Sequence, residues 1–254
     1  MSYLCAIFLW LAIQTPLDRQ LATVDFEQRP GALLPLNLTF RDEAGQSVRL
    51  GKYFGARPVV LVFAYSACPN LCHVVLNGTL ESLRNLPGTA GHDFEVVVVS
   101  IDPKETAHAA MQQKQTYTAR YARPGSAAGW HFLTGDEPAI HTLTDAAGYR
   151  YIYDAASGQF AHPSGLVIVT PTGKISRYFL GIEYPPKEVR TALTEAAQDH
   201  VGNLAERLLL LCFHYNPSLG RYGALITHTL QVAGLGTVLA VIIFMRRAHR
   251  HPCV

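Results

Sequence analysis

Two cysteines separated by three residues, Cys68 and Cys72, are the side chains in this sequence best suited to chemistry. They follow an apolar, β-branched run at residues 58–63, which predicts a buried strand, and residues 73–84 have apolar positions at roughly helical spacing. Because a helix N-terminus lowers thiol pKa and favours the thiolate, these sulfurs could be nucleophiles, redox partners or soft-metal ligands. The alternative is a pair of buried cysteines that pack as small hydrophobic side chains.

The spacing of the two cysteines bears on which metal they could hold. Oxidation would close a small disulfide ring, whereas the reduced pair suits a soft cation of low coordination number. Cu(I) is the natural choice for two thiolates and an imidazole. Zinc usually takes four ligands, often with a second closely spaced pair, and the sequence has no such pair.

His162 is favoured as the third ligand among eleven histidines. It comes shortly before an apolar run at residues 166–169, which predicts another buried strand. If this strand neighbours the strand at 58–63, His162 lies near the loop that carries the thiols. An exposed loop histidine is the alternative, and His73, next to Cys72, could also reach a metal. The remaining candidates considered are expected in loops or on helix faces: His92, His108, His131 and His141.

Strand and helix signals alternate over residues 28–200 and predict an α/β sandwich. Residues 36–40 and a turn at 42–45 predict a small N-terminal hairpin. A valine-rich run at 94–101 predicts a strand covered on both faces. The other expected elements are helices at 105–121, 136–147 and 186–198 and a strand at 174–180.

Composition excludes two classes of protein. A formal net charge of +2 with 16% charged residues gives no case for nucleic-acid binding by the chain as a whole. Five cysteines are too few and too scattered for a disulfide framework. Cys5 and Cys253 stand in the terminal segments, which leaves Cys68, Cys72 and Cys212 in the body of the chain.

The C-terminal region carries a membrane signal. Residues 222–245 contain no charged side chain, and an arginine cluster follows them directly. This length predicts a transmembrane helix at 222–246 and a basic cytoplasmic tail at 247–254, with a juxtamembrane segment at 201–221 before them. A buried helix is the alternative. The expected topology places the domain at 28–200 outside the cytoplasm.

The N-terminal segment, residues 1–27, is the candidate for export of that domain. Its apolar stretch at 3–13 has signal-peptide length but lacks a basic n-region and an Ala-x-Ala cleavage site. We expect a signal-like or anchor segment, with a buried first helix as the alternative.

Four motifs follow one another along residues 28–198. They are YSACPNLC at 65–72, VSIDP at 99–103 with ET at 105–106, WHFLTG at 130–135, and His162 ahead of a strand that ends in TPTG at 170–173. In this order they resemble the Sco/SenC proteins, thioredoxin-fold copper chaperones for the CuA site of cytochrome c oxidase.

The resemblance implies a thioredoxin-like sandwich with an N-terminal hairpin extension, a Cu(I) site of Cys68, Cys72 and His162, and a disulfide between the same cysteines. Copper could also be held as Cu(II). The implied partners are the CuA-bearing subunit of cytochrome c oxidase and an upstream copper donor or thiol reductant. The implied location is a bacterial inner membrane, with the domain in the periplasm. Asp102 would support the site electrostatically or cap a helix.

Two positions depart from the family pattern. His73 stands where many members have a second proline, and Ala161 stands where many carry an acidic residue that could orient the ligand histidine. Near the C-terminus, Cys212 and His214 resemble a tail in a bacterial branch of the family. They could form a second, softer copper site, or the segment could simply be amphipathic and lead into the bilayer.

Two functions from different classes follow. The first is a membrane-tethered copper-binding assembly factor that passes Cu(I) to a partner by ligand exchange, without turnover as an enzyme. The second is a thiol–disulfide oxidoreductase acting on cysteine pairs of exported proteins, for which His162 should matter little. A peroxide-reducing enzyme is a weaker third reading, because it rests on fold alone. His162 favours the copper-binding protein.

Overall fold

The computed structural model describes residues 23–66, 72–202, 234 and 237, and the side chain of Cys72 is outside this description. The chain divides into two units, Met1–Leu204 and Ala205–Val254. Of the second unit only Gly234 and Thr237 are described.

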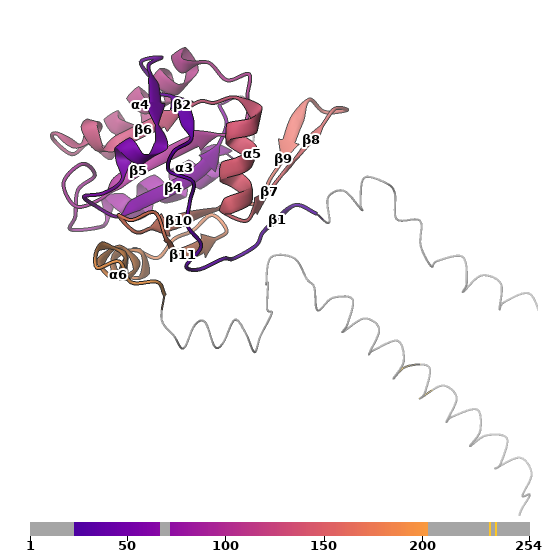
Figure 1. The fold of residues 1–254 in the computed structure, drawn as a ribbon. Coiled ribbons are helices and arrows are strands. Elements are labelled where there is room, and N and C mark those ends of the chain that lie inside the picture. The colour runs from indigo at the N-terminus through magenta and orange to yellow at the C-terminus, as the bar shows by residue number, and fades with distance from the viewer. Residues whose placement is uncertain (1–22, 67–71, 203–233, 235–236, 238–254) are drawn as a thin grey trace, which may run out of the picture. The chain divides into compact units, whose positions relative to one another are not determined.

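A five-stranded sheet with the order β11-β10-β4-β5-β6 forms the centre of the first unit (Figure 1). Strands β4, β5 and β6 are parallel, and β10 is antiparallel to both β4 and β11. All residues of β4 and β10 are buried, as are all but the first of β5. The predictions of two buried strands and of a valine-rich strand covered on both faces are therefore confirmed. The strands are β4 (Val59–Ala64), β5 (Glu95–Ser100), β6 (Trp130–Leu133), β10 (Gly165–Val169) and β11 (Ile175–Leu180).

Four helices surround this sheet: α3 (Cys72–Arg84), α4 (Ala107–Tyr121), α5 (Glu137–Ala146) and α6 (Pro186–Ala197). Helix α3 contacts α4 and α6 as well as strands β4 and β10. Helix α4 packs on β6 and α6 packs on β10 and β11, whereas α5 lies beside the short strand β7 (Tyr149–Arg150) (Figure 1). Strands and helices alternate as the sequence predicts, and the first unit is an α/β sandwich.

The helix starts follow from their caps. Asp136 is the N-cap of α5, as its position in the sequence suggests, and its side chain accepts a hydrogen bond from the amide of Ala139. Helix α4 begins at Ala107, later than the predicted start at residue 105, because Thr106 is the N-cap and accepts from the Ala109 amide. Glu105 is therefore outside the helix.

Short hairpins and bridges complete the first unit. The predicted N-terminal hairpin is present as β2 (Thr39–Arg41) and β3 (Ser47–Arg49), but residues 36 and 37 form a turn rather than part of the strand. Strand β6 and a second hairpin are not among the predicted elements. The remaining elements are β1 (Asp25–Phe26), which pairs with β7, the second hairpin of β8 (Ile152–Asp154) and β9 (Gln159–Ala161), and the 3-10 helices η1 (Leu50–Tyr53) and η2 (Ser126–Gly129).

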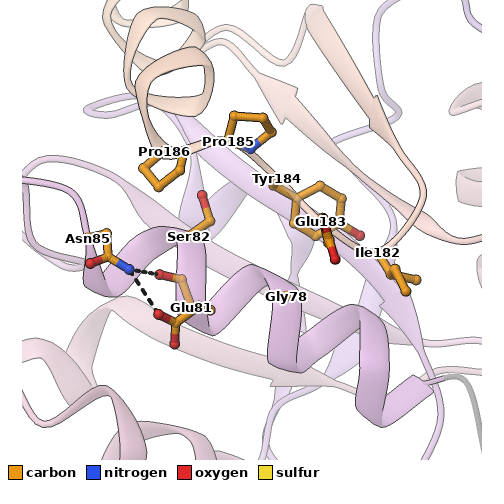
Figure 2. A pocket seen from close by; sticks show the side chains of 9 residues that line it. All are labelled: Gly78, Glu81, Ser82, Asn85, Ile182, Glu183, Tyr184, Pro185 and Pro186. Carbon is orange, nitrogen blue, oxygen red and sulfur yellow. Dashed lines mark hydrogen bonds between the residues drawn. The ribbon is translucent and has the colours of Figure 1, made fainter.

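Gly78, in the middle of α3, lets this helix approach the loop after β11. A Cβ atom at this position would lie 1.9 Å from the backbone carbonyl oxygen of Ile182, so only glycine fits. Between α3 and this loop is a pocket of 330 Å³ lined by Gly78, Glu81, Ser82, Asn85 and residues 182–186 (Figure 2). None of the predicted ligands lines this pocket.

Within the described part of the chain, no helix combines the length and apolarity that crossing a membrane requires. The helix predicted at 222–246 lies outside the described residues, apart from Gly234 and Thr237. The signal-like stretch at 3–13 lies outside them as well. Both therefore stay predictions.

Candidate metal centre

One edge of the sheet brings together the chain segments that carry the predicted ligands. Strand β4 ends at Ala64, beside Ser100 at the end of the parallel strand β5. Strand β10 runs the other way and begins at Gly165, so the residues before it lie at the same edge. The segments after β4, after β5 and before β10 therefore converge there, as is common for sites in α/β sheets.

The two cysteines belong to the segment that follows β4. Cys68 lies outside the described residues, so the predicted ligand set is not tested as a whole. Cys72 is the first residue of α3. The expectation that this cysteine lies at a helix N-terminus is therefore confirmed. The partial positive charge of that terminus favours a thiolate. Among the described residues no group of three or more His, Cys, Asp or Glu side chains could hold a metal ion.

His162 is buried, with 9% of its surface exposed, so the alternative of an exposed loop histidine is wrong. Its Nδ1 lies 2.9 Å from the Tyr149 hydroxyl and 3.0 Å from the Pro163 carbonyl oxygen. A carbonyl oxygen only accepts hydrogen bonds, so the Pro163 contact is satisfied by the tautomer with the proton on Nδ1, in which the lone pair is on Nε2. This is the tautomer that binds a metal through Nε2.

Tyr149 supplies the orientation that the missing acidic residue would have given. Ala161 ends β9 and offers no carboxylate, as the sequence shows. The Tyr149 hydroxyl contacts His162 Nδ1 and also donates to the Pro163 carbonyl oxygen at 3.1 Å, and the Tyr149 ring stacks on the imidazole with centroids 6.3 Å apart. Sequence reasoning did not find this residue.

An aromatic contact joins His162 to the segment that leads to Cys68. The ring of Tyr65 meets the imidazole edge-to-face with centroids 5.9 Å apart, and it meets Phe160 with centroids 5.3 Å apart. The Phe160 amide also donates to the Tyr65 hydroxyl at 3.3 Å. Tyr65 precedes Cys68 by three residues. The structure therefore brings the histidine and the start of the cysteine segment together, as predicted from the strand order.

Two acidic residues, Asp102 and Glu105, follow β5. Asp102 does not cap α4, because Thr106 is the N-cap, and Asp102 Oδ1 accepts from the Lys104 amide in the turn before this helix. Its electrostatic support of the site stays a prediction. Glu105 is the acid that reaches the cysteine segment: its Oε2 accepts from the Ser66 amide at 2.8 Å and from the Ser100 hydroxyl at 2.7 Å. Burial raises the pKa of the Glu105 carboxyl above its ordinary value. Its place next to Thr106 in a matched motif was the only signal in the sequence.

The other candidate histidines are distributed over helices, a loop and a strand, and whether His73 reaches a metal stays a prediction. His73 is exposed in the first turn of α3 and lines a groove of 510 Å³ between α3 and α4. His92 pairs with Asp93 in a loop, and the exposed His108 and His141 lie on helices, as expected. His131 was expected in a loop or on a helix, which is wrong, because it is part of β6.

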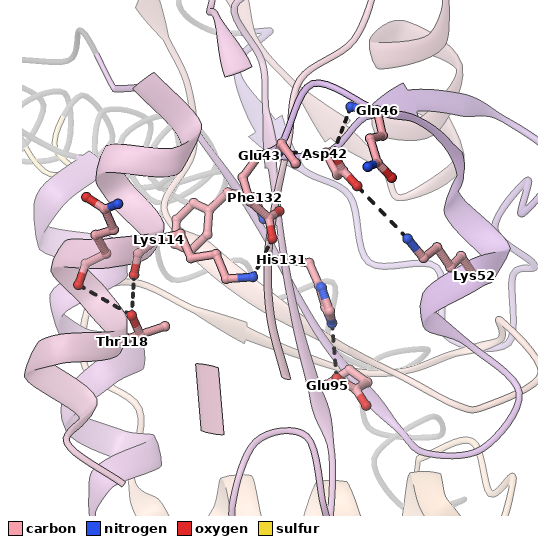
Figure 3. A network of polar contacts seen from close by, with 11 residues as sticks. Asp42, Glu43, Gln46, Lys52, Glu95, Lys114, Thr118, His131 and Phe132 are labelled. Carbon is pink, nitrogen blue, oxygen red and sulfur yellow. Dashed lines mark hydrogen bonds and ion pairs between the residues drawn. The ribbon is translucent and has the colours of Figure 1, made fainter. Parts of the chain in front are cut away.

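A second cluster of titratable side chains lies at the opposite end of the sheet, where β5 begins (Figure 3). Glu95 accepts from His131 Nε2 at 3.1 Å and from Arg57 at 2.6 Å. Burial raises the pKa of Glu95, but these two hydrogen bonds and charges outweigh it, and the net pKa is lowered. The His131 ring packs against Tyr53 with centroids 4.2 Å apart. This cluster stabilises the fold away from the predicted ligands.

Comparison with known proteins agrees with this fold. A Stutzerimonas stutzeri protein named for copper binding is 27% identical over 119 residues, 46% of this chain and 54% of the relative, so the chain spans about half the length of that relative. The crystal structure of an Aquifex aeolicus protein described in terms of electron transfer is 26% identical, with a TM-score of 0.59 over 67% of this chain and 95% of the other.

A second solved structure, Arabidopsis thaliana ScoI with copper bound, shares the fold at 15% identity, with a TM-score of 0.52 over 68% of this chain and 99% of the other. The thioredoxin-like fold expected from the motifs is therefore confirmed. The family model described as SCO1/SenC matches residues 28–198, most of the first unit. The chain belongs to the SCO1/SenC family.

Proposed function

We propose that this protein binds Cu(I) through Cys68, Cys72 and His162 and assists assembly of the CuA site of cytochrome c oxidase. The observation that carries the proposal is the environment of His162. A buried imidazole whose Nδ1 bonds to Pro163 and Tyr149 presents Nε2 as a ligand, and Tyr65 holds the cysteine segment beside it. The copper-binding name of the S. stutzeri relative supports the same metal.

Copper is cargo in this proposal. Two thiolates and a neutral imidazole give a soft, three-coordinate set that suits Cu(I). Transfer to the CuA-bearing subunit proceeds by ligand exchange: each thiolate of this chain is replaced by a thiolate of the partner, and the copper keeps its oxidation state. An upstream copper donor reloads the site.

The proposed location is a bacterial inner membrane. A transmembrane helix at 222–246 would tether the first unit in the periplasm, with the basic tail at 247–254 in the cytoplasm. Labelling of single cysteines introduced at the exposed positions Ser157 and Glu188 with a membrane-impermeant thiol reagent tests this topology in intact spheroplasts. Labelling that requires permeabilisation would contradict a periplasmic domain.

A thiol–disulfide oxidoreductase is the second candidate, and the position of Cys72 at the start of α3 favours it. In that reaction a thiolate of this chain attacks a partner disulfide and forms a mixed disulfide. The second cysteine then releases the reduced partner and leaves the Cys68–Cys72 disulfide, which a thiol reductant must reduce. A histidine ligand has no part in these steps.

Anaerobic Cu(I) titration against a chromogenic chelator separates the two functions. The protein is the full chain in detergent, fully reduced, with Cys5→Ser, Cys212→Ser and Cys253→Ser so that only the predicted pair carries thiols. We expect one Cu(I) per chain, its loss in Cys68→Ser, and an affinity lowered by at least about tenfold in His162→Ala.

The control is His92→Ala. His92 is an exposed histidine in a loop, and among the described residues its side chain forms an ion pair only with Asp93. Its affinity should equal that of the parent chain. If the parent holds no copper against the chelator while its cysteines still cycle between dithiol and disulfide, the oxidoreductase is the correct function.

A further inference from the structure

Glu105 is a half-buried carboxylate in the turn between β5 and α4. It does not cap α4, because Thr106 does so. One of its oxygens, Oε2, accepts two hydrogen bonds, from the Ser66 amide at 2.8 Å and from the Ser100 hydroxyl at 2.7 Å. Removing a carboxylate from water is unfavourable unless hydrogen bonds compensate, so these two bonds define where it sits.

Ser66 is the residue through which Glu105 reaches the candidate metal centre. It stands two residues before Cys68 and directly after Tyr65. Tyr65 is held from the other side, by its edge-to-face contact with His162 and by the Phe160 amide. The chain that leaves β4 is thus fixed at consecutive residues, by the histidine side of the centre at Tyr65 and by Glu105 at Ser66.

Strand pairing alone does not fix this segment. The last bond of the sheet here is donated by the Ile101 amide to the Ala64 carbonyl oxygen. Strand β4 ends at Ala64, and the Ser66 amide beyond it donates to the Glu105 side chain. Asp102 is the other acidic residue in this turn, and its Oδ1 accepts from the Lys104 amide rather than from Ser66.

We propose that Glu105 is a positioning residue, which fixes the direction of the chain from β4 toward Cys68 relative to His162. The inference rests on the proposed function, because it assigns a role in the same metal centre. Loss of the Glu105 oxygen would free the Ser66 amide, and the cysteines would spend less time where His162 can share a metal with them. Support of this kind by groups outside the ligand set is commonly worth about 10–100-fold in metal affinity.

The bonding pattern predicts a particular rescue. Because Oε2 accepts from both the Ser66 amide and the Ser100 hydroxyl, the amide oxygen of glutamine can keep these two bonds in Glu105→Gln while the charge is lost. Glu105→Ala removes the acceptor. We expect Cu(I) affinity to fall by about tenfold in Glu105→Ala and to stay within about threefold of the parent in Glu105→Gln.

The test uses the full chain with Cys5→Ser, Cys212→Ser and Cys253→Ser. Cu(I) affinity is measured by competition, and the equilibrium between dithiol and disulfide is measured in the metal-free protein against a glutathione buffer. We expect that equilibrium to shift by at least about threefold in Glu105→Ala only, because it depends on how closely the thiols are held. The control is Glu188→Ala, an exposed glutamate in the first turn of α6.

Each result decides the question. The positioning role is overturned if Glu105→Ala has the Cu(I) affinity of the parent chain. It is also overturned if Glu105→Gln loses as much affinity as Glu105→Ala, because that result would show that the charge matters. If Glu105→Ala does not fold, Glu105→Gln and Ser100→Ala are measured instead. Ser100→Ala leaves the Ser66 bond in place and should bind copper within about threefold of the parent. Absence of Cu(I) binding by the parent chain refutes the proposed function instead, and the glutathione equilibrium still tests Glu105.

Discussion

Replacement of Tyr149 by phenylalanine tests whether the orientation of His162 matters for metal binding. The hydroxyl is the only group removed. The ring keeps its edge-to-face contact with Phe26, with centroids 5.0 Å apart, its contact with Phe63 at 4.7 Å and its stack on His162. Because Tyr149 is 1% exposed and its ring stays packed, any change in copper binding comes from the lost hydroxyl.

The size of the effect follows from what remains on Nδ1. Without the hydroxyl, Nδ1 keeps its contact with the Pro163 carbonyl oxygen at 3.0 Å. A net hydrogen bond is worth about 0.5–1.5 kcal/mol, which corresponds to a loss of about twofold to tenfold in affinity. We therefore expect Tyr149→Phe to weaken Cu(I) binding by up to about tenfold, less than His162→Ala does.

Competitive Cu(I) titration of the full chain measures this loss, and ¹⁵N chemical shifts of the imidazole report the His162 tautomer. The matched control is Tyr178→Phe. Its hydroxyl also donates to a backbone carbonyl, that of Ala147, and it accepts from the Arg29 amide; neither of these bonds involves His162. Both variants should lose about 1 kcal/mol of stability, and only Tyr149→Phe should lose affinity. Equal affinities in the two variants would falsify the orienting role.

Three further predictions concern stability and metal stoichiometry. Gly78→Ala should lower the free energy of unfolding by at least about 1–3 kcal/mol, because the new Cβ would overlap the Ile182 carbonyl oxygen. Chemical denaturation measures this loss. A more stable variant, as expected for alanine in an unobstructed helix, would contradict the prediction. The pKa of Glu95 is lower in the folded protein than its ordinary value of 4.5, so Glu95 adds stability above pH 4.5 that is lost as the pH falls through the lower folded value. His131→Phe removes one of the groups that lower this pKa. The variant should therefore be less stable at pH 7, and its denaturation midpoint should fall less steeply toward acid pH. In the otherwise unaltered full chain, Cys212→Ser should leave the copper count unchanged, and a fall from two ions to one would establish a second site.

Most strands of the central sheet could be predicted because a strand that is buried on both faces has an uninterrupted apolar sequence. Strands β4, β5 and β10 each lie within one residue of the predicted bounds. Strand β6 has only four residues, and the β8–β9 hairpin pairs only with itself among the described strands. Short strands of that kind carry too few residues to show a period.

The candidate site was predictable where it depends on strand order and not where it depends on side-chain partners. His162 could be chosen because it precedes a buried strand. Tyr149 could not, because its position depends on the pairing of β7 with β1, which sets Tyr149 opposite Phe26. Asp102 and Glu105 are three residues apart in a turn, and only the bonds to Ser66 and Ser100 show which of them reaches the centre.

The contacts around Tyr65 and Ser66 bear on how one pair of cysteines could serve both metal binding and disulfide chemistry. The histidine is held by Tyr149 and Pro163, neither of which belongs to the cysteine segment. The cysteine segment is held by Glu105 and by the aromatic contact with His162. Because the Tyr149 hydroxyl bonds to His162 and Pro163 whereas Glu105 bonds to the cysteine segment at Ser66, loss of the Tyr149 hydroxyl should weaken copper binding and leave the dithiol–disulfide equilibrium unchanged, and Glu105→Ala should alter both. Measurement of both quantities in both variants therefore tells whether the histidine and the thiols are positioned independently, and a Tyr149→Phe protein with a shifted thiol equilibrium would show that they are not.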